Sequence, residues 1–316
     1  MQKNNGLDKN QLISFVIFSA ILMAFMFYFQ NKQSDEKQVA DAKAKTEQKV
    51  ASKTIANNIN ATVNAAAIKN VTVKNKELTL EFASLGGQLS SVEINQYKAY
   101  NAKTDKHDLP LYLIEKNNSS YGFQFKDKTG KTFNTKDLVF VPSVKDNTVT
   151  MTAQVSGATI QYVYQLLDNY TLDFNVKTQG LSSIVTDEKA DFHWNYTVRG
   201  MEKGRSQEQT HSEFNYAFDN YGSTDYDTNG FEEPEETLNW LAVKQQFFAS
   251  IIESTNGFTH AKGTQETIEK GEFLKKFNFE GQVKLAGNEL NQNFKWYFLP
   301  LDLPLLKTFE GKEFDT

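Results

Sequence analysis

Cysteine is absent from the 316 residues of the chain. Without it the protein can form no disulfide, no thiolate zinc site, no lipid-modified cysteine anchor and no cysteine nucleophile. A strong charge of one sign is absent too, because 34 Lys and Arg accompany 39 Asp and Glu and give a net charge of −5. A nucleic-acid partner normally needs a basic patch, so we expect none.

Long hydrophobic runs are also scarce, and only residues 12–29, LISFVIFSAILMAFMFYF, form one. A helix of that length rises roughly 27 Å, close to the ~30 Å of bilayer hydrocarbon. The apolar part of a signal peptide is shorter and ends at a small-residue cleavage site, whereas this run ends in Tyr28 and Phe29. We therefore interpret residues 1–31 as an uncleaved transmembrane anchor. Lysines on both sides of the run leave its orientation open.

The composition changes twice after the anchor. Residues 32–68 are rich in Ala, Lys, Gln and Asn and almost free of aromatics, so they cannot bury enough apolar surface to fold. We expect a flexible linker there, whose coil would reach on the order of 35 Å. Residues 69–316 contain most of the Phe and Tyr and are long enough for a large core. They form the predicted globular domain.

Within that domain the hydrophobic pattern has a period of two, which is typical of half-buried strands. Gly- and Asn-containing pairs between the strands favour antiparallel hairpins. Residues 240–252 fit both the strand period and the helix period, so a short helix stays possible there. The predicted fold is mainly β, a large antiparallel β-sandwich preceded by one transmembrane helix. The alternating segments are 78–82, 149–155, 160–166, 170–176, 192–198 and 294–298, and the turns are at Gly86-Gly87, Thr129-Gly130, Asp146-Asn147, Asp168-Asn169 and Asn256-Gly257.

One loop matches the spacing of a calcium site. Asp225, Asp227, Asn229 and Glu236, with Gly230 between them, satisfy D-x-[DN]-x-[DN]-G-x5-E. The flanks do not read as the helices of such a site, and Pro234 lies inside the loop. An acidic solvated loop is the favoured interpretation, and a calcium-stabilised adhesion module is the alternative.

Other candidate chemistry is unspecific. A catalytic histidine would need a carboxylate partner; His193 lies on the polar face of its strand and His211 is two residues from Glu213, and neither arrangement is specific. We expect the histidines to be solvated and the aromatics between 216 and 226 to pack internally rather than to line a sugar groove. The histidines are His107, His193, His211 and His260, and the aromatics are Tyr216, Phe218, Tyr221 and Tyr226.

Three segments together resemble the YidC-type membrane protein insertases of the Oxa/Alb/YidC family. Residues 7–29 are similar to the D-[KR]-N opening and first span of that family. Residues 71–100 are similar to its first strands, with Gly86 and Gly87 at the turn. Residues 239–252, NWLAVKQQFFASII, resemble its W-[ILV]-[AG]-x-x-[QD]-[QK]-[YF]-F segment.

The resemblance implies a periplasmic β-supersandwich, related in shape to sugar mutarotases, on a single inner-membrane span whose N-terminus is cytoplasmic. It implies work in protein transport and as a chaperone, with the bilayer, Sec translocon components and nascent membrane proteins as partners. It implies no enzyme activity, no cofactor and no catalytic residue. The signature residues, for which we expect a structural role, are Gly86, Gly87, Trp240, Gln245, Gln246, Phe247 and Phe248.

In that family a five-helix membrane core with a hydrophilic groove follows the domain, and no residue of this chain matches the groove. We expect a chain without that core, whether through a truncated sequence, a separate polypeptide or divergence. The alternative function is a membrane-anchored carbohydrate-binding or mutarotase-like sandwich, which would need a cleft with a His/Glu pair and stacked aromatics. We further expect Trp240, Phe247 and Phe248 in the sandwich core, because their segment is dense in apolar side chains.

Overall fold

The computed structural model describes residues 69–218, 223–227 and 230–309, which belong to one compact unit spanning residues 62–316. The predicted anchor at 12–29 and the predicted linker at 32–68 lie outside the described residues. Within the described ranges, no helix combines the length and the apolar character that a bilayer crossing requires.

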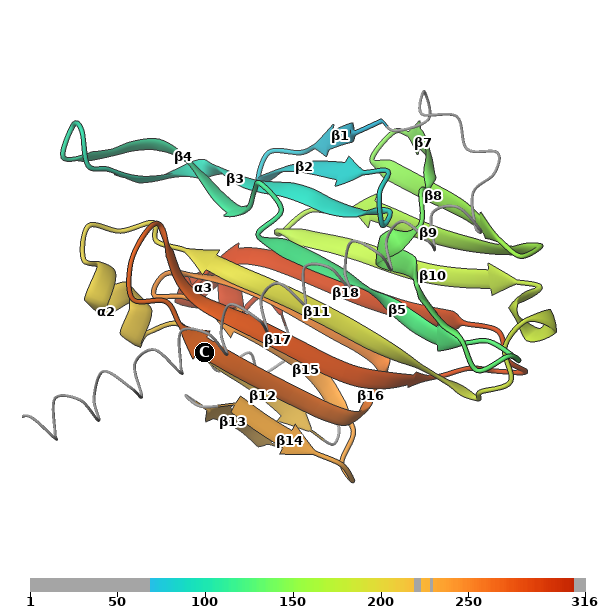
Figure 1. Cartoon of the computed structure of the whole chain (residues 1–316). Coiled ribbons are helices and arrows are strands. Elements are labelled where there is room, and N and C mark those ends of the chain that lie inside the picture. The colour runs from blue at the N-terminus through green and yellow to red at the C-terminus, as the bar shows by residue number, and fades with distance from the viewer. Residues whose placement is uncertain (1–68, 219–222, 228–229, 310–316) are drawn as a thin grey trace, which may run out of the picture. The chain divides into compact units, whose positions relative to one another are not determined.

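A small antiparallel sheet opens the described chain, in the order β1-β2-β3-β4 (Figure 1). In β2, Leu78, Leu80 and Phe82 are fully buried and alternate with half-exposed residues, because successive side chains of a strand point to opposite faces. The outer part of the β3–β4 hairpin extends past the other two strands. The strands are β1 (Val71–Lys74), β2 (Leu78–Ala83), β3 (Gln88–Asn101) and β4 (Lys106–Ile114).

The other fourteen strands are hydrogen-bonded into one continuous antiparallel system. Three short helical segments lie between these strands, η2 (Thr135–Asp137), η3 (Leu181–Ser183) and α2 (Arg205–Thr210), and a fourth, α3 (Leu303–Leu306), follows β18. The strands are β5 (Ser119–Lys126), β6 (Thr132–Asn134), β7 (Val141–Lys145), β8 (Thr148–Val155), β9 (Ala158–Leu166), β10 (Thr171–Gln179), β11 (Lys189–Arg199), β12 (Glu213–Phe218), β13 (Ser223–Asp227), β14 (Gly230–Glu233), β15 (Leu238–Lys244), β16 (Phe248–Thr267), β17 (Phe273–Lys284) and β18 (Asn291–Pro300).

The 20-residue strand β16 divides this system into two layers. Its first part pairs with β15 and β18, and its last part pairs with β14 and β17. We call β6-β5-β11-β17 with the last part of β16 and β14 the β11 layer. We call β7-β8-β9-β10-β18 with the first part of β16, β15, β12 and β13 the β18 layer.

The bend of β16 between the layers lies where the sequence predicted a hairpin turn. Asn256 and Gly257 are inside the strand, so that prediction is wrong. Gly257 has φ +69° and His260 has φ +52°, and the pairing register with β17 shifts between Thr259 and Lys262. Strands that pass from one sheet to another commonly bend at such irregularities. Asn256 and Gly257 are residue types typical of tight turns, but here they lie at a bend within one strand, and the chain does not reverse its direction.

An aromatic core lies between the two layers. The indole ring of Trp194 on β11 meets that of Trp296 on β18 edge-on at 4.9 Å between centroids. Phe123 of the β11 layer likewise contacts Phe294 of the β18 layer at 5.7 Å. Such ring pairs add roughly 0.5–1.5 kcal/mol to the burial of their area. The predicted mainly β antiparallel sandwich is therefore confirmed for the described residues.

The small sheet packs on the β18 layer through the same aromatic cluster. The ring of Phe82 on β2 lies 4.6 Å from that of Tyr164 on β9. The hydroxyl of Tyr164 donates to the backbone oxygen of Gly87 at 3.0 Å and shares a hydrogen bond with the hydroxyl of Tyr121. The buried phenols are thus hydrogen-bonded, as buried polar groups usually are.

Candidate functional site

The signature segment, residues 239–252, consists of β15, a tight turn and the start of β16. The possible helix is not formed. The backbone N–H of Gln245 donates to the oxygen of Phe248 at 2.8 Å, which leaves Gln246 and Phe247 at the centre of the turn. We call residues 244–248 the signature turn.

Two hydrogen bonds fix the signature turn to other elements. The side-chain amide of Gln245, which is 2% exposed, donates to the backbone oxygen of Arg199 at the end of β11. The backbone oxygen of Phe247 accepts from the N–H of Leu301, just after β18, at 2.8 Å. Arg199 in turn forms ion pairs with Glu115 and Glu272. The turn is therefore held from both layers.

The three signature aromatics occupy three different environments. Phe248 is 4% exposed and contacts the ring edge of Tyr97 at 5.3 Å. Trp240 is fully buried, but its register partners Ala217 and Glu253 place it on the side of the β18 layer away from the aromatic core. Phe247 is 50% exposed, so its predicted core position is wrong. It sits at the centre of the turn, where no neighbouring strand covers the side chain.

The other signature residues, Gly86 and Gly87, form the connection between β2 and β3 with φ of +78° and +61°. A Cβ on Gly87 would lie 2.7 Å from the ring of Phe140. The N–H of Gly86 donates to the backbone oxygen of Leu138 at 2.8 Å. Left-handed backbone and close approach of a ring both require glycine here.

Beside the signature turn, the segment that connects β11 to β12 carries a buried carboxylate. Glu208 on α2 is 1% exposed and accepts from the backbone N–H groups of Met201 and Glu202 at 2.8 and 3.1 Å. Burial raises the pKa of Glu208 above its ordinary value, and those two backbone donors partly oppose the rise.

The loop at residues 201–203 holds the projecting β3–β4 hairpin. The N–H of Tyr100 donates to the oxygen of Met201 at 2.8 Å. Glu202 contacts the Nε2 atom of His107 at 2.9 Å, and Lys203 forms a 2.6 Å ion pair with Asp105. No motif in the sequence indicated this contact, because it joins residues almost a hundred positions apart.

Arginine and glutamine side chains of α2 hold the β16–β17 connection. The guanidinium of Arg205 donates to the backbone oxygens of Ile268, Gly271 and Phe273 at 2.5 to 2.8 Å. Gln209 donates to those of Ile268 and Leu274. A six-residue helix has too little periodicity to be found by sequence pattern alone.

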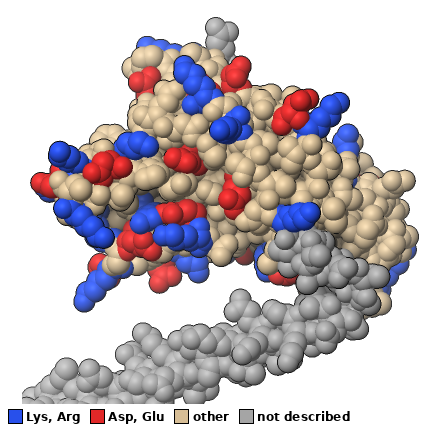
Figure 2. Space-filling model, turned by 90° about the horizontal axis from the view of Figure 1, so that it is seen from above, with Lys and Arg blue, Asp and Glu red and all other residues tan. Residues whose placement is uncertain are grey.

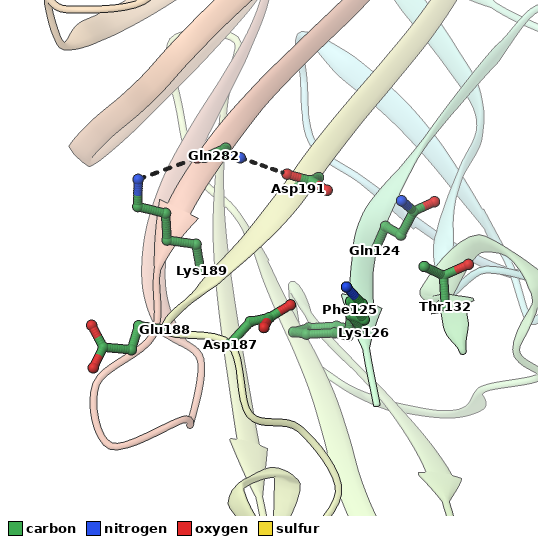
Figure 3. A pocket seen from close by; sticks show the side chains of 9 residues that line it. All are labelled: Gln124, Phe125, Lys126, Thr132, Asp187, Glu188, Lys189, Asp191 and Gln282. Carbon is green, nitrogen blue, oxygen red and sulfur yellow. Dashed lines mark hydrogen bonds between the residues drawn. The ribbon is translucent and has the colours of Figure 1, made fainter. Parts of the chain in front are cut away.

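An open pocket of about 390 Å³ lies beside the β5–β6 hairpin and the start of β11 (Figure 3). Gln282 donates to Asp191 at 3.1 Å and accepts from Lys189 at 3.3 Å. The ring of Phe125 is 2% exposed and offers no open face for stacking. None of the residues singled out in the sequence lines this pocket, whose walls are Gln124, Phe125, Lys126, Thr132, Asp187, Glu188, Lys189, Asp191 and Gln282.

The histidines are dispersed over the domain. His193 lies 3.7 Å from Glu280 on the outer face of the β11 layer, and His211 contacts the backbone oxygen of Gln207 in α2. His260 marks the bend of β16. Neither the His193–Glu280 pair nor the His107–Glu202 pair lines the pocket of Figure 3. The cleft with a His/Glu pair and stacked aromatics that a mutarotase-like site needs is not assembled there.

The described residues of the calcium pattern are spread over β13, the start of β14 and the β14–β15 connection, where Glu236 lies. Asp225 and Asp227 belong to β13, where they pair with Tyr216 and Phe214 of β12. The pattern continues into β14, which pairs with β16. The predicted continuous acidic loop is therefore wrong for this part of the chain. Asn229 and the side chains of both aspartates lie outside the described residues, and no cluster of three acidic or histidine ligands occurs among the side chains that are described.

Two of the four aromatics between residues 216 and 226 pack internally, as expected. Tyr216 and Phe218 are 7% and 6% exposed, and the ring of Tyr216 lies 4.2 Å from that of Phe231. Tyr221 and the side chain of Tyr226 lie outside the described residues.

On the face of the domain shown in Figure 2, Lys and Arg side chains are interspersed with Asp and Glu.

A protein-family model described as "YidC periplasmic domain" matches residues 70–315. Among curated proteins, the membrane protein insertase YidC of Parabacteroides distasonis is 26% identical over 347 residues, which are 96% of this chain and 53% of that protein. The membrane protein insertase YidC of Phocaeicola vulgatus is 28% identical over 84% of this chain and 46% of its own length. The chain thus spans about half the length of the curated relatives it matches.

Solved structures also resemble this chain at low identity. A putative aldose 1-epimerase from Escherichia coli K12 has a TM-score of 0.45 and 11% identity, covering 74% of this chain and all of that one. The periplasmic domain of the Thermotoga maritima YidC has a TM-score of 0.39 and 12% identity, covering 80% and 93%.

Proposed function

The chain belongs to the YidC periplasmic-domain family, and on this premise we propose that it is the anchored periplasmic part of a membrane protein insertase, which assists insertion, folding and assembly of inner-membrane proteins. The observation that carries the proposal is the match over residues 70–315. The alignment with the Parabacteroides insertase supports it, because 96% coverage takes in most of the residues before the domain as well.

We propose the following layout. Residues 1–31 anchor the chain in the bacterial inner membrane with a cytoplasmic N-terminus, residues 32–68 are a linker, and residues 69–316 lie in the periplasm. The apolar run at 12–29 supports the anchor by its length. Moving a polar segment through hydrocarbon costs several kcal/mol unless a hydrated path exists. A single span forms no such path, so this part of the insertase acts by binding rather than as an enzyme.

The signature turn is the contact surface that we propose for nascent membrane proteins and Sec translocon components. Phe247 presents a half-exposed aromatic ring at its tip. The turn itself is fixed by Gln245 to the end of β11 and by Phe247 to the chain after β18. An exposed aromatic on a rigid support loses little conformational entropy on binding, which is why such residues often dominate interfaces.

Site-specific photocrosslinking tests this contact surface. A photoreactive residue at Phe247 should yield adducts with a nascent membrane protein or a translocon subunit during insertion. Val144 on β7 is a matched control, because its exposure of 45% is close to the 50% of Phe247. Equal adduct yields at both positions, or none at Phe247, would remove the signature turn from the proposal.

The layout is tested separately with topology reporters. A reporter that works only outside the cytoplasm, fused after Thr316, should be active, and one that works only in the cytoplasm should be silent. The opposite pattern would contradict the periplasmic location without affecting family membership.

A further inference from the structure

The outer part of the β3–β4 hairpin, residues 97–110, extends beyond the strand that pairs with the rest of β3. β2 pairs with β3 only as far as Ile94, and residues 102–110 are all exposed. Figure 1 shows this part projecting at the end of the domain where α2 lies. Segments with little buried surface open more readily than the core. We call residues 97–110 the outer hairpin.

The outer hairpin docks on the chain that follows β11. The N–H of Tyr100 donates to the backbone oxygen of Met201, and the ammonium of Lys203 lies 5.9 Å from the centre of the Tyr100 ring. The ion pairs of Glu202 and Lys203 with the hairpin add to this contact. We call residues 199–203 the junction, because the same segment also contacts the signature turn.

The peptide group between Arg199 and Gly200 in the junction is fixed from two sides. Its oxygen accepts from the side-chain amide of Gln245 in the signature turn at 2.9 Å. Its N–H donates to the backbone oxygen of Glu272, in the β16–β17 connection, at 2.9 Å. A trans peptide directs its oxygen and its N–H to opposite sides. Losing the bond to Gln245 therefore leaves this group with one of these two bonds and makes it freer to rotate.

The peptide group between Met201 and Glu202 is fixed in the same manner. Its oxygen accepts from Tyr100 of the outer hairpin, and its N–H donates to the buried carboxylate of Glu208 at 3.1 Å. A single peptide group separates it from the one at Arg199. A displacement at Arg199 therefore moves the oxygen to which Tyr100 donates.

We propose that the junction couples the outer hairpin to the signature turn, so that the docked hairpin regulates the turn. A partner that immobilises the turn fixes Arg199 through Gln245 and thereby holds the hairpin. The ring contact between Tyr97 of the hairpin and Phe248 of the turn, at 5.3 Å, acts in the same direction. Coupling between two sites is reciprocal in free energy, so a docked hairpin also holds the turn. The role in partner binding rests on the contact surface proposed above.

Hydrogen exchange of the full chain in detergent, read by mass spectrometry, tests the coupling without any partner. Gln245→Ala removes the bond from the signature turn to the junction. The matched control is Gln292→Ala, because Gln292 is 3% exposed against 2% for Gln245 and its hydrogen bonds go to Ser254 and Asn256 at the bend of β16.

We expect the outer hairpin to exchange at least roughly threefold faster in Gln245→Ala than in the parent chain, and at the parent rate in Gln292→Ala, because exchange follows the local opening equilibrium. Unchanged exchange of the outer hairpin in Gln245→Ala would overturn the proposal. Equal acceleration in Gln292→Ala would do the same, since it would mean a general loosening of the domain.

The reverse direction is tested at the hairpin contact. The double variant Glu202→Ala with Lys203→Ala removes both ion pairs to the hairpin and should speed the exchange of residues 244–248 by roughly two- to tenfold. The matched control is Glu232→Ala with Lys262→Ala, which removes an exposed ion pair between β14 and β16 and should leave that exchange unchanged. The same rate for residues 244–248 in both double variants would contradict the coupling.

Photocrosslinking from position 247 distinguishes the coupling from the contact surface itself. The adduct yield should fall in the Glu202→Ala, Lys203→Ala chain and stay at the parent value in the Glu232→Ala, Lys262→Ala chain. Equal yields in the two chains would overturn regulation of the turn by the hairpin. No adduct in any chain would instead remove the contact surface, and the exchange rates would still decide whether hairpin and turn are coupled.

Discussion

At the residue scale, the signature aromatics separate structural from surface roles. Truncating Trp240 or Phe248 to Ala should cost about 3–5 kcal/mol of unfolding free energy, since both are buried and a cavity remains. That is a large share of the 5–15 kcal/mol common for domains. Phe247→Ala, at a half-exposed ring, should change stability by no more than about 0.5 kcal/mol. Urea unfolding of the three variants measures these losses. A loss in Phe247→Ala as large as in the other two would mean that the ring of Phe247 is buried.

Gly87 offers a second residue-scale prediction. Gly87→Ala should cost about 2–4 kcal/mol, because its Cβ must enter the ring of Phe140 and its φ is +61°. The matched control is Gly157→Ala, which has φ +87° but no atom within 4 Å of the added Cβ, so only about 1 kcal/mol is expected. Thermal melts of both variants make the comparison. Equal losses would mean that backbone strain alone, and not ring packing, selects glycine at 87.

The buried carboxyl of Glu208 should make the stability of the domain depend on pH. Burial raises its folded-state pKa, so the folded protein takes up this proton before the unfolded chain does. The resulting stabilisation is fully present below the unfolded value near 4.5 and is lost as pH rises through the folded pKa. The stability of the parent chain relative to Glu208→Gln, which cannot titrate, should therefore increase as pH falls toward 4.5. Unfolding curves for the pair at several pH values test it, and a constant difference would refute the titration.

At the element scale, side chains of α2 hold the β16–β17 connection by hydrogen bonds to its backbone. Arg205→Ala should destabilise the domain by about 2–3 kcal/mol, because three backbone oxygens lose a charged donor. Arg205→Lys should restore only part of that loss, since a single ammonium cannot reproduce the planar fork. Lys203→Ala, which removes an exposed ion pair nearby, should have little effect. Chemical denaturation measures the unfolding free energy of the three variants. An unchanged value in Arg205→Ala would show that α2 does not stabilise this connection.

Strands with one solvated face could be predicted from the sequence. Leu78, Leu80 and Phe82 alternate with polar residues because only one side of β2 is buried, and the structure follows that pattern. In β15 and the start of β16 both faces are buried, so the apolar residues run on without alternation. That is why residues 240–252 fitted helix and strand equally well.

The candidate site was only partly accessible to sequence reasoning. Trp240 and Phe248 were found through their apolar neighbours, but Phe247 shares those neighbours and differs only in its place in the turn. Asp225 and Asp227 had the spacing of metal ligands, yet pairing with β12 holds their backbone extended. Spacing along the chain does not report such long-range pairing. The hydrogen bonds from α2 to the β16–β17 connection, and the contacts of residues 201–203 with the β3–β4 hairpin, could not be predicted for the same reason.

For the whole molecule, the compact unit that begins at residue 62 should fold independently of what precedes it. Among the described residues, the buried hydrophobic side chains run from Val73 to Leu299 and so lie within this unit. A chain that starts at residue 62 should therefore keep the melting temperature of the domain in the full chain, measured by near-ultraviolet circular dichroism. A markedly lower value would show that earlier residues contribute to the fold.

The pairing of β10 with β18 has a consequence for how the protein is made. About 115 residues separate these neighbouring strands in the sequence. At translation rates of roughly 5–20 residues per second, β10 leaves the ribosome on the order of 10 s before its partner exists. For that interval one long edge of β10, which carries the apolar Leu172, Phe174 and Val176, is unpaired and open to other chains. High contact order thus makes aggregation during synthesis, rather than instability of the finished domain, the main hazard for this fold.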